Sequence, residues 1–119
     1  TGASGFLGRR LMARLLADGH HLHVAGRTVP GGLPSGVAFS PWPSAGSPFP
    51  PDAIEAASAI VHLAGEPVAQ RWNEEAKKRI RSSRVDSTGQ IVNAIEASGR
   101  RPEVLVCASA SGFYGDRGD

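Results

Sequence analysis

Three glycines at a strict three-residue spacing open the chain and constrain its fold more than any other feature. The first residues read TGASGFLGRRL, so that Gly2, Gly5 and Gly8 run directly into an apolar helical pattern. Glycine lets a backbone turn tightly or approach a ligand closely, and in dinucleotide-binding folds such a loop joins the first strand to the first helix. The free N–H groups at the start of that helix would then face a pyrophosphate. The spacing therefore predicts a phosphate-binding loop.

The same loop suggests how much of the fold this chain contains. A loop of this kind follows a strand, whereas this chain begins at the loop and without a methionine. We therefore expect a fragment of a dinucleotide-binding domain that lacks its first strand and much of its C-terminal part. The residues expected to contact the cofactor in this region are Gly2, Gly5, Phe6, Leu7 and Gly8.

Strand and helix patterns alternate along the rest of the chain. Helices are expected from about Gly5 to Ala17, over 52–57 with Asp52 as the cap, and from about Asn73 to Ser98; short strands are expected within 22–25, 37–39, 58–65 and 101–109. Such alternation implies βαβ units and a mainly parallel sheet. We predict an α/β fold, a truncated Rossmann-like doubly wound parallel sheet, forming one partial domain over residues 1–119. A Pro/Gly/Ser-rich stretch at about 30–51 is expected to be a variable loop.

The residue that reads the cofactor's ribose is expected at the end of the second strand of such a fold. NAD binders place an acidic residue there to accept a hydrogen bond from the ribose 2′-hydroxyl. Here the strand ends VAGRT, so that Gly26 and Arg27 stand in that place. A guanidinium can bind a 2′-phosphate bidentately, whereas a carboxylate would repel it. This favours NADP over NAD. The alternative is that Arg27 is a solvated loop arginine.

One arginine of the long helix falls in line with the apolar stripe of that helix. The stripe consists of residues three or four apart, Ile80, Arg84, Thr88, Ile91 and Ile95. A charge in such a stripe is costly unless it is paired. We therefore predict that Arg84 is a ligand of the anionic cofactor, with a buried ion pair to Asp86 or another acid as the alternative.

Composition excludes several other classes of protein. The chain has 119 residues, 40% of them hydrophobic and 20% charged, and a net charge of +2. Apolar runs stay well short of the ~20 residues that span a membrane. The small charge does not call for nucleic acid, and Cys107 is alone, which makes a reducing compartment the default. We expect a cytoplasmic protein with a small-molecule substrate, no metal, and no nucleic-acid or membrane partner; the oligomeric state, a homodimer included, stays open. Trp42 and Trp72 are expected to pack in the interior.

Three blocks of the chain, TGASGFLG, VHLAGEPVAQRWNEEAKKRIRSSRVDST and CASASGFYGDRGD, resemble the extended short-chain dehydrogenase/reductase superfamily. The resemblance is greater to its atypical epimerase-family branch, commonly named after nucleoside-diphosphate-sugar epimerases. It implies a Rossmann fold, NADP binding, and an oxidoreductase or epimerase activity on a small carbonyl or sugar-nucleotide substrate. It also implies that the backbone of Leu63, Ala64 and Gly65 lines the cofactor. His62, flanked by Val61 and Leu63, is typical of a packed core residue rather than of an acid or base.

The resemblance places the chemistry in the last segment. In catalytic relatives a serine after this strand hydrogen-bonds the substrate oxygen, and a Tyr with a Lys four residues on exchanges the proton. Ser109 is the candidate serine, with Ser111 as the alternative. Tyr114 is followed at that spacing by Gly118, so it matches the YG turn that lies well before the catalytic Tyr in the relatives; the chain ends before such a Tyr–Lys pair could appear, and we expect the 119-residue chain to be inactive by itself. A non-catalytic NADP-binding sensor or scaffold is therefore the alternative to an enzyme.

Overall fold

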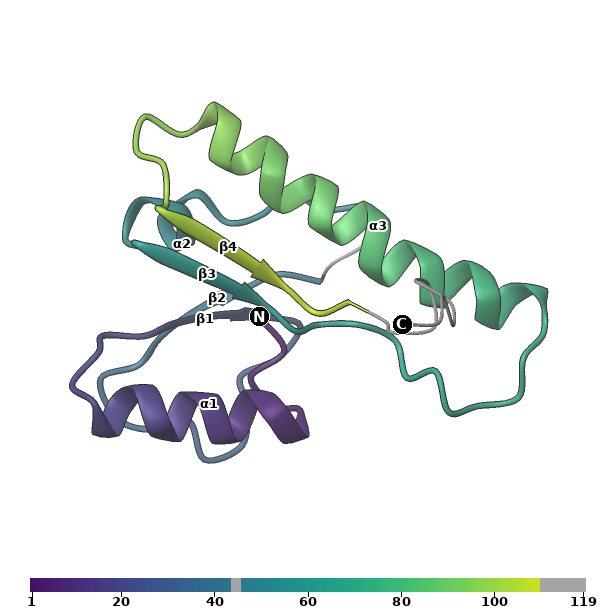
Figure 1. Ribbon diagram of the computed structural model, residues 1–119, viewed down its shortest axis with the longest axis horizontal. Helices are drawn as coiled ribbons and strands as arrows, with labels where there is room; N and C mark the ends of the chain where they lie inside the picture. Colours follow the sequence, from purple (N-terminus) through teal and green to yellow (C-terminus); the bar gives the residue numbers. More distant parts are fainter. Residues whose placement is uncertain (44–45, 110–119) are drawn as a thin grey trace, which may run out of the picture.

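The elements follow one another in the order that the sequence patterns predict. The computed structural model describes residues 1–43 and 46–109. Over these residues the order is α1 (Phe6–Ala17), β1 (His23–Gly26), β2 (Ala38–Pro41), α2 (Pro51–Glu55), β3 (Ala59–His62), α3 (Glu74–Ala97) and β4 (Val104–Cys107). The strands form a middle layer, with α1 on one side and α3 on the other (Figure 1). Helices on both sides of parallel strands confirm the Rossmann-like α/β class.

The strands pair in parallel, but as two pairs. β1 lies beside β2 and β3 beside β4, which makes two separate two-stranded sheets in the described part of the chain instead of one continuous sheet. Thr1 adds a further partner at the end of β3, because its N–H₃⁺ donates to the Val61 carbonyl (2.7 Å) and its carbonyl accepts from the Leu63 N–H (3.4 Å). These two bonds follow the pattern of a parallel ladder. The glycine-rich loop therefore starts from a position beside β3.

The hydrophobic core lies where the strands meet α2 and α3. Its buried members are Ala25, Trp42, Phe49, Ala53, Ile54, Ile60 and Ile91. Two of them, Trp42 and Phe49, come from the part of the 30–51 stretch that was expected to be loop outside the predicted strand at 37–39, and their rings meet edge to face with centroids 4.9 Å apart. The prediction that Trp42 packs in the interior is confirmed, since only 1% of it is exposed. The Pro-rich segment thus contributes a strand and two core aromatics.

Asp52 does not cap the short helix, contrary to the sequence prediction. The helix begins at Pro51, after Pro50, and no side chain caps it. The Asp52 carboxylate instead accepts a hydrogen bond from Ser40 Oγ and lies 3.7 Å from His23 Nε2. The Ser40 hydrogen bond lowers the pKa of Asp52. The carboxylate therefore links α2 to β1 and β2.

The segment between β3 and α3 is held at its end by a true cap. Asn73 precedes α3, and its Oδ1 accepts a hydrogen bond from the Ala76 N–H (2.7 Å). Trp72, which was expected to pack inside, is 60% exposed. Its Nε1 donates to the Val68 carbonyl (2.8 Å), so the exposed indole stabilises the segment between β3 and α3 from its solvent side. Neither α3 nor any other described helix combines the length and the apolar character that crossing a membrane requires.

Candidate functional site

An open cleft of about 240 Å³ lies at the carboxyl ends of β1 and β3. Its lining consists of residues 2–5 of the glycine-rich loop, residues 24–28 at the end of β1 with Pro30 beyond them, Trp42 after β2, residues 63–66 after β3, and Ser83 of α3. Among the residues that line it are seven that the sequence suggested, Gly2, Gly5, Gly26, Arg27, Leu63, Ala64 and Gly65. Ligands of open α/β sheets bind at this edge.

The glycines of the loop are needed for packing as much as for a ligand. Gly2 has a φ of +74°, and a Cβ added to it would lie 2.6 Å from the Leu63 carbonyl carbon. A Cβ added to Gly8 would lie 2.1 Å from the Gly2 carbonyl oxygen. Only glycine therefore lets the loop lie directly against the residues after β3 and lets α1 lie directly against the loop.

The start of α1 has the features of an anion-binding helix N-terminus. Gly5 precedes the helix, no side chain caps it, and the first turn contains no acidic residue. Phe6 and Leu7 in this turn are 73% and 62% exposed, so their main chain is accessible. The first N–H groups of a helix lack intrahelical partners and favour negative charge. These residues fit a pyrophosphate.

Arg27, at the end of β1, contributes a positive charge to the lining of the cleft. It follows β1 directly, is exposed and lines the cleft. Within residues 1–43 and 46–109, its guanidinium takes part in no hydrogen bond or ion pair. The end of β1 thus presents a cation that has no partner in the described part of the chain, and no carboxylate.

Arg84 lies at the cleft's edge, but not in the buried setting expected of it. Its guanidinium packs over Gly65, where an added Cβ would lie 3.1 Å from Arg84 Cζ. The residue is exposed, and Nη1 donates to the carbonyls of Glu66 (3.0 Å) and Ile80 (3.2 Å). None of the ion pairs in the described part of the chain joins it to Asp86, which is exposed as well, so the alternative of a buried ion pair is wrong. The first half of α3 extends past the ends of the strands (Figure 1), although Ala76 in this half is buried and Ile80 is half-buried.

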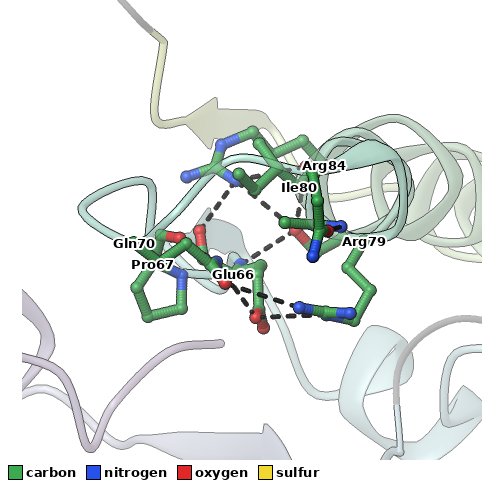
Figure 2. Close-up of polar contacts among 9 residues, drawn as sticks. Glu66, Pro67, Gln70, Arg79, Ile80 and Arg84 are labelled. Carbon is green, nitrogen blue, oxygen red and sulfur yellow. Dashed lines mark hydrogen bonds and ion pairs between the residues drawn. The ribbon is translucent and has the colours of Figure 1, made fainter.

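Glu66 fastens the segment after β3 to α3. Its N–H donates to Ser83 Oγ (2.8 Å), and its carboxylate accepts from Gln70 Nε2 (3.2 Å) and lies 3.5 Å from Arg79 Nε. Figure 2 shows Arg79 and Arg84 both reaching from α3 toward Glu66. Sequence reasoning missed Glu66 and Ser83 as cleft residues. The one available signal for Glu66 was its place directly after the predicted LAG backbone segment.

His62 is buried beneath the cleft, as expected of a core position. It is 3% exposed, with Nδ1 2.7 Å from Thr1 Oγ1 and Nε2 3.0 Å from Ser87 Oγ. Burial lowers the pKa of His62 to about 4. The ring is therefore neutral at pH 7 and has a hydrogen-bond partner on each nitrogen.

Ser109 lies at the same edge of the strands. It is exposed and two residues beyond β4, and the N–H of the preceding Ala108 donates to the His62 carbonyl (3.2 Å). Ser111, Tyr114 and Gly118 lie outside the described residues. Across the described ranges, no three His, Cys, Asp or Glu side chains gather as metal ligands.

Comparisons with known proteins agree with this geometry. The model of the NAD dependent epimerase/dehydratase family matches residues 1–119. The chain is 38% identical, over 97% of its length, to the chloroplastic epimerase family protein SDR39U1 homolog of Arabidopsis thaliana, and covers 34% of that relative. It is 32% identical to the epimerase family protein YfhF of Bacillus subtilis, over 97% of this chain and 38% of the relative. It is also 32% identical to ML0860 of Mycobacterium leprae, over 100% of this chain and 37% of the relative.

These relatives are longer proteins than the chain described here. The chain spans roughly a third of the length of the curated relatives that it matches. No solved structure matches it significantly.

Proposed function

Because the chain belongs to the NAD dependent epimerase/dehydratase family, we propose that its cleft binds NADP and serves an oxidoreductase or epimerase. The substrate class would be a small carbonyl compound or a sugar nucleotide. One observation carries the proposal: the start of α1, which no side chain caps, and the guanidinium of Arg27, which has no partner within the described residues, line or adjoin a single cleft.

Each part of the cleft suits one part of the cofactor. The N–H groups at the start of α1 would hold the pyrophosphate, and Arg27 would bind the 2′-phosphate that distinguishes NADP from NAD. The main chain of Leu63 and Gly65 would lie along the nucleotide. The cofactor, when bound, supplies hydride transfer. Ser109, exposed at the same edge, would donate a hydrogen bond to the substrate oxygen.

Arg84 would contact a part that both nicotinamide nucleotides share. All its hydrogen bonds within the described residues use Nη1, which leaves Nε and Nη2 as donors. It packs over Gly65, which lines the cleft, and it comes from α3, whereas Arg27 follows β1. We therefore assign Arg84 to the phosphates or ribose common to NADP and NAD.

Titration of the whole protein with NADPH and NADH tests this function. We expect NADPH to bind more tightly than NADH, and Arg84→Ala to weaken both by a similar factor. The loss of one charge-assisted contact corresponds to about one order of magnitude or more in Kd. Failure of both nucleotides to bind, or tighter binding of NADH, would contradict the proposal.

A second candidate is a sensor or scaffold that binds NADP without turnover. Several members of the superfamily that the chain resembles lack the Tyr–Lys pair. Incubating the whole protein with NADPH and a panel of carbonyl and sugar-nucleotide substrates distinguishes the two. Tight NADPH binding without oxidation or epimerisation would favour the sensor.

A further inference from the structure

The two walls of the cleft come from distant parts of the chain and are joined through one buried imidazole. The glycine-rich loop starts at Thr1, whereas α3 contributes Ser83 to the lining of the cleft and Arg84 over Gly65 at its edge. A ligand that touches both walls needs them at a fixed separation. His62, in β3, contacts the support of each.

One nitrogen of the ring holds the loop. His62 Nδ1 lies 2.7 Å from Thr1 Oγ1, and the same hydroxyl accepts a hydrogen bond from the Ala64 N–H (3.3 Å). The Thr1 hydroxyl proton is therefore free to be donated to Nδ1. Gly2 follows at once and lies against the Leu63 main chain. This side of the ring thus positions the start of the loop.

The other nitrogen holds α3. His62 Nε2 lies 3.0 Å from Ser87 Oγ, and Ser87 is fully buried. The Ser87 hydroxyl lies 2.6 Å from the Ser83 carbonyl and 3.3 Å from the Arg84 carbonyl. Both carbonyl oxygens can only accept a hydrogen bond. Ser87 therefore donates its single proton to this turn, and Nε2 must carry the proton that reaches Ser87 Oγ. The same turn supplies the side chains that bind Glu66.

These partners leave one protonation pattern for the ring. Nδ1 accepts from Thr1 and Nε2–H donates to Ser87, which is the neutral Nε2–H tautomer. A second ring proton would place two donors, those of Nδ1 and Ala64, on the Thr1 hydroxyl, and would deprive the hydroxyl proton of its acceptor.

We propose that His62 is a positioning residue for cofactor binding, whose Nε2–H tautomer couples the glycine-rich loop, through Thr1, to the Ser83–Arg84 turn of α3, through Ser87. The inference rests on the proposed cofactor site. It assigns His62 no contact with the cofactor or the substrate. Its effect is to fix the distance between two parts of the site: the start of α1, which would hold the pyrophosphate, and Arg84 at the edge of the cleft.

A double-mutant cycle on the whole protein tests the coupling. Thr1→Val removes the hydrogen bond between His62 and the loop, and Ser87→Ala removes the hydrogen bond between His62 and α3. The NADPH Kd is measured for each single variant and for the double variant. Each single change should raise Kd about three- to tenfold, the effect of one hydrogen bond. Because both hydrogen bonds act through the same imidazole ring, losing one already breaks the coupling. The double variant should therefore raise Kd little more than either single variant. Ile60→Val, a buried change in the same strand, is the control: it should lower stability while leaving Kd within about twofold.

The ring itself provides a second readout. Histidine ¹⁵N chemical shifts should report the Nε2–H tautomer for His62 in the unaltered protein. Three results would overturn the inference: additive losses of NADPH affinity in the double variant, an unchanged Kd in both single variants, or an Nδ1–H tautomer. In each of these cases, NADPH binding by the unaltered protein would still uphold the proposed function. If the unaltered protein binds neither NADPH nor NADH, the proposed function is wrong and this inference falls with it.

Discussion

Replacing Gly8 with alanine should destabilise the protein, even though alanine is the better helix former. In an open helix position the change from glycine to alanine gains about 1 kcal/mol. At Gly8 the added Cβ would lie 2.1 Å from the Gly2 carbonyl oxygen and 2.8 Å from Ala3 Cα. Both are main-chain atoms, so α1 or the loop must shift by about an ångström, and overpacking of this kind costs about 1–3 kcal/mol or more. We expect a net loss of about 1–2 kcal/mol.

Gly89 offers a matched control, because it also lies within a helix, α3, and an added Cβ would meet nothing within 4 Å. Gly89→Ala should therefore raise the free energy of unfolding by about 0.5–1 kcal/mol. Urea unfolding of the three proteins measures both effects, and the NADPH Kd should rise only for Gly8→Ala, since the shift displaces Gly2 from Leu63. Stabilisation by both substitutions would refute the view that glycine at position 8 is required for packing.

Two further predictions concern stability. Trp42→Ala should cost about 3–5 kcal/mol because this core indole is 1% exposed, whereas Trp72→Ala, at a 60% exposed indole, should cost about 1 kcal/mol or less in the same urea titration; equal losses would contradict the burial that separates them. His62 has a folded-state pKa of about 4, below its usual value of about 6.5, so its contribution is fully present above pH 6.5 and is lost as pH falls toward 4. This decline should amount to about 3 kcal/mol and be absent in His62→Gln, and an identical pH profile for the two proteins would exclude His62 as its source.

The parts of the fold that could be predicted are those set by local signals. The spacing of Gly2, Gly5 and Gly8 identified the loop because close main-chain approach restricts positions 2 and 8 to glycine. The alternation of strands and helices followed from hydrophobic periodicity. The absence of an acid beside Arg27 could likewise be read directly from the chain. The structure places these residues at one sheet edge.

Other features depend on distances that the sequence does not contain. The stripe through Arg84 suggested a buried charge, but the guanidinium lies over Gly65 at an exposed position and donates to the Glu66 carbonyl. Asp52 had the pattern of a helix cap, yet a bond to Ser40 of a neighbouring strand prevailed. Trp72 was expected inside because tryptophan is large and apolar, although its loop lies outside the core. In each case a tertiary contact overrode a local preference.

The central claim, that the cleft reads the 2′-phosphate of NADP through Arg27, is tested most directly by titrating the unaltered protein and Arg27→Ala with both NADPH and NADH. The guanidinium has no partner within the described residues and is free to form charge-assisted hydrogen bonds, each worth about 1.5–3 kcal/mol. We predict that Arg27→Ala raises the Kd for NADPH by about one to two orders of magnitude and leaves the Kd for NADH almost unchanged. An equal loss of affinity for both nucleotides, or no loss for either, would contradict the account.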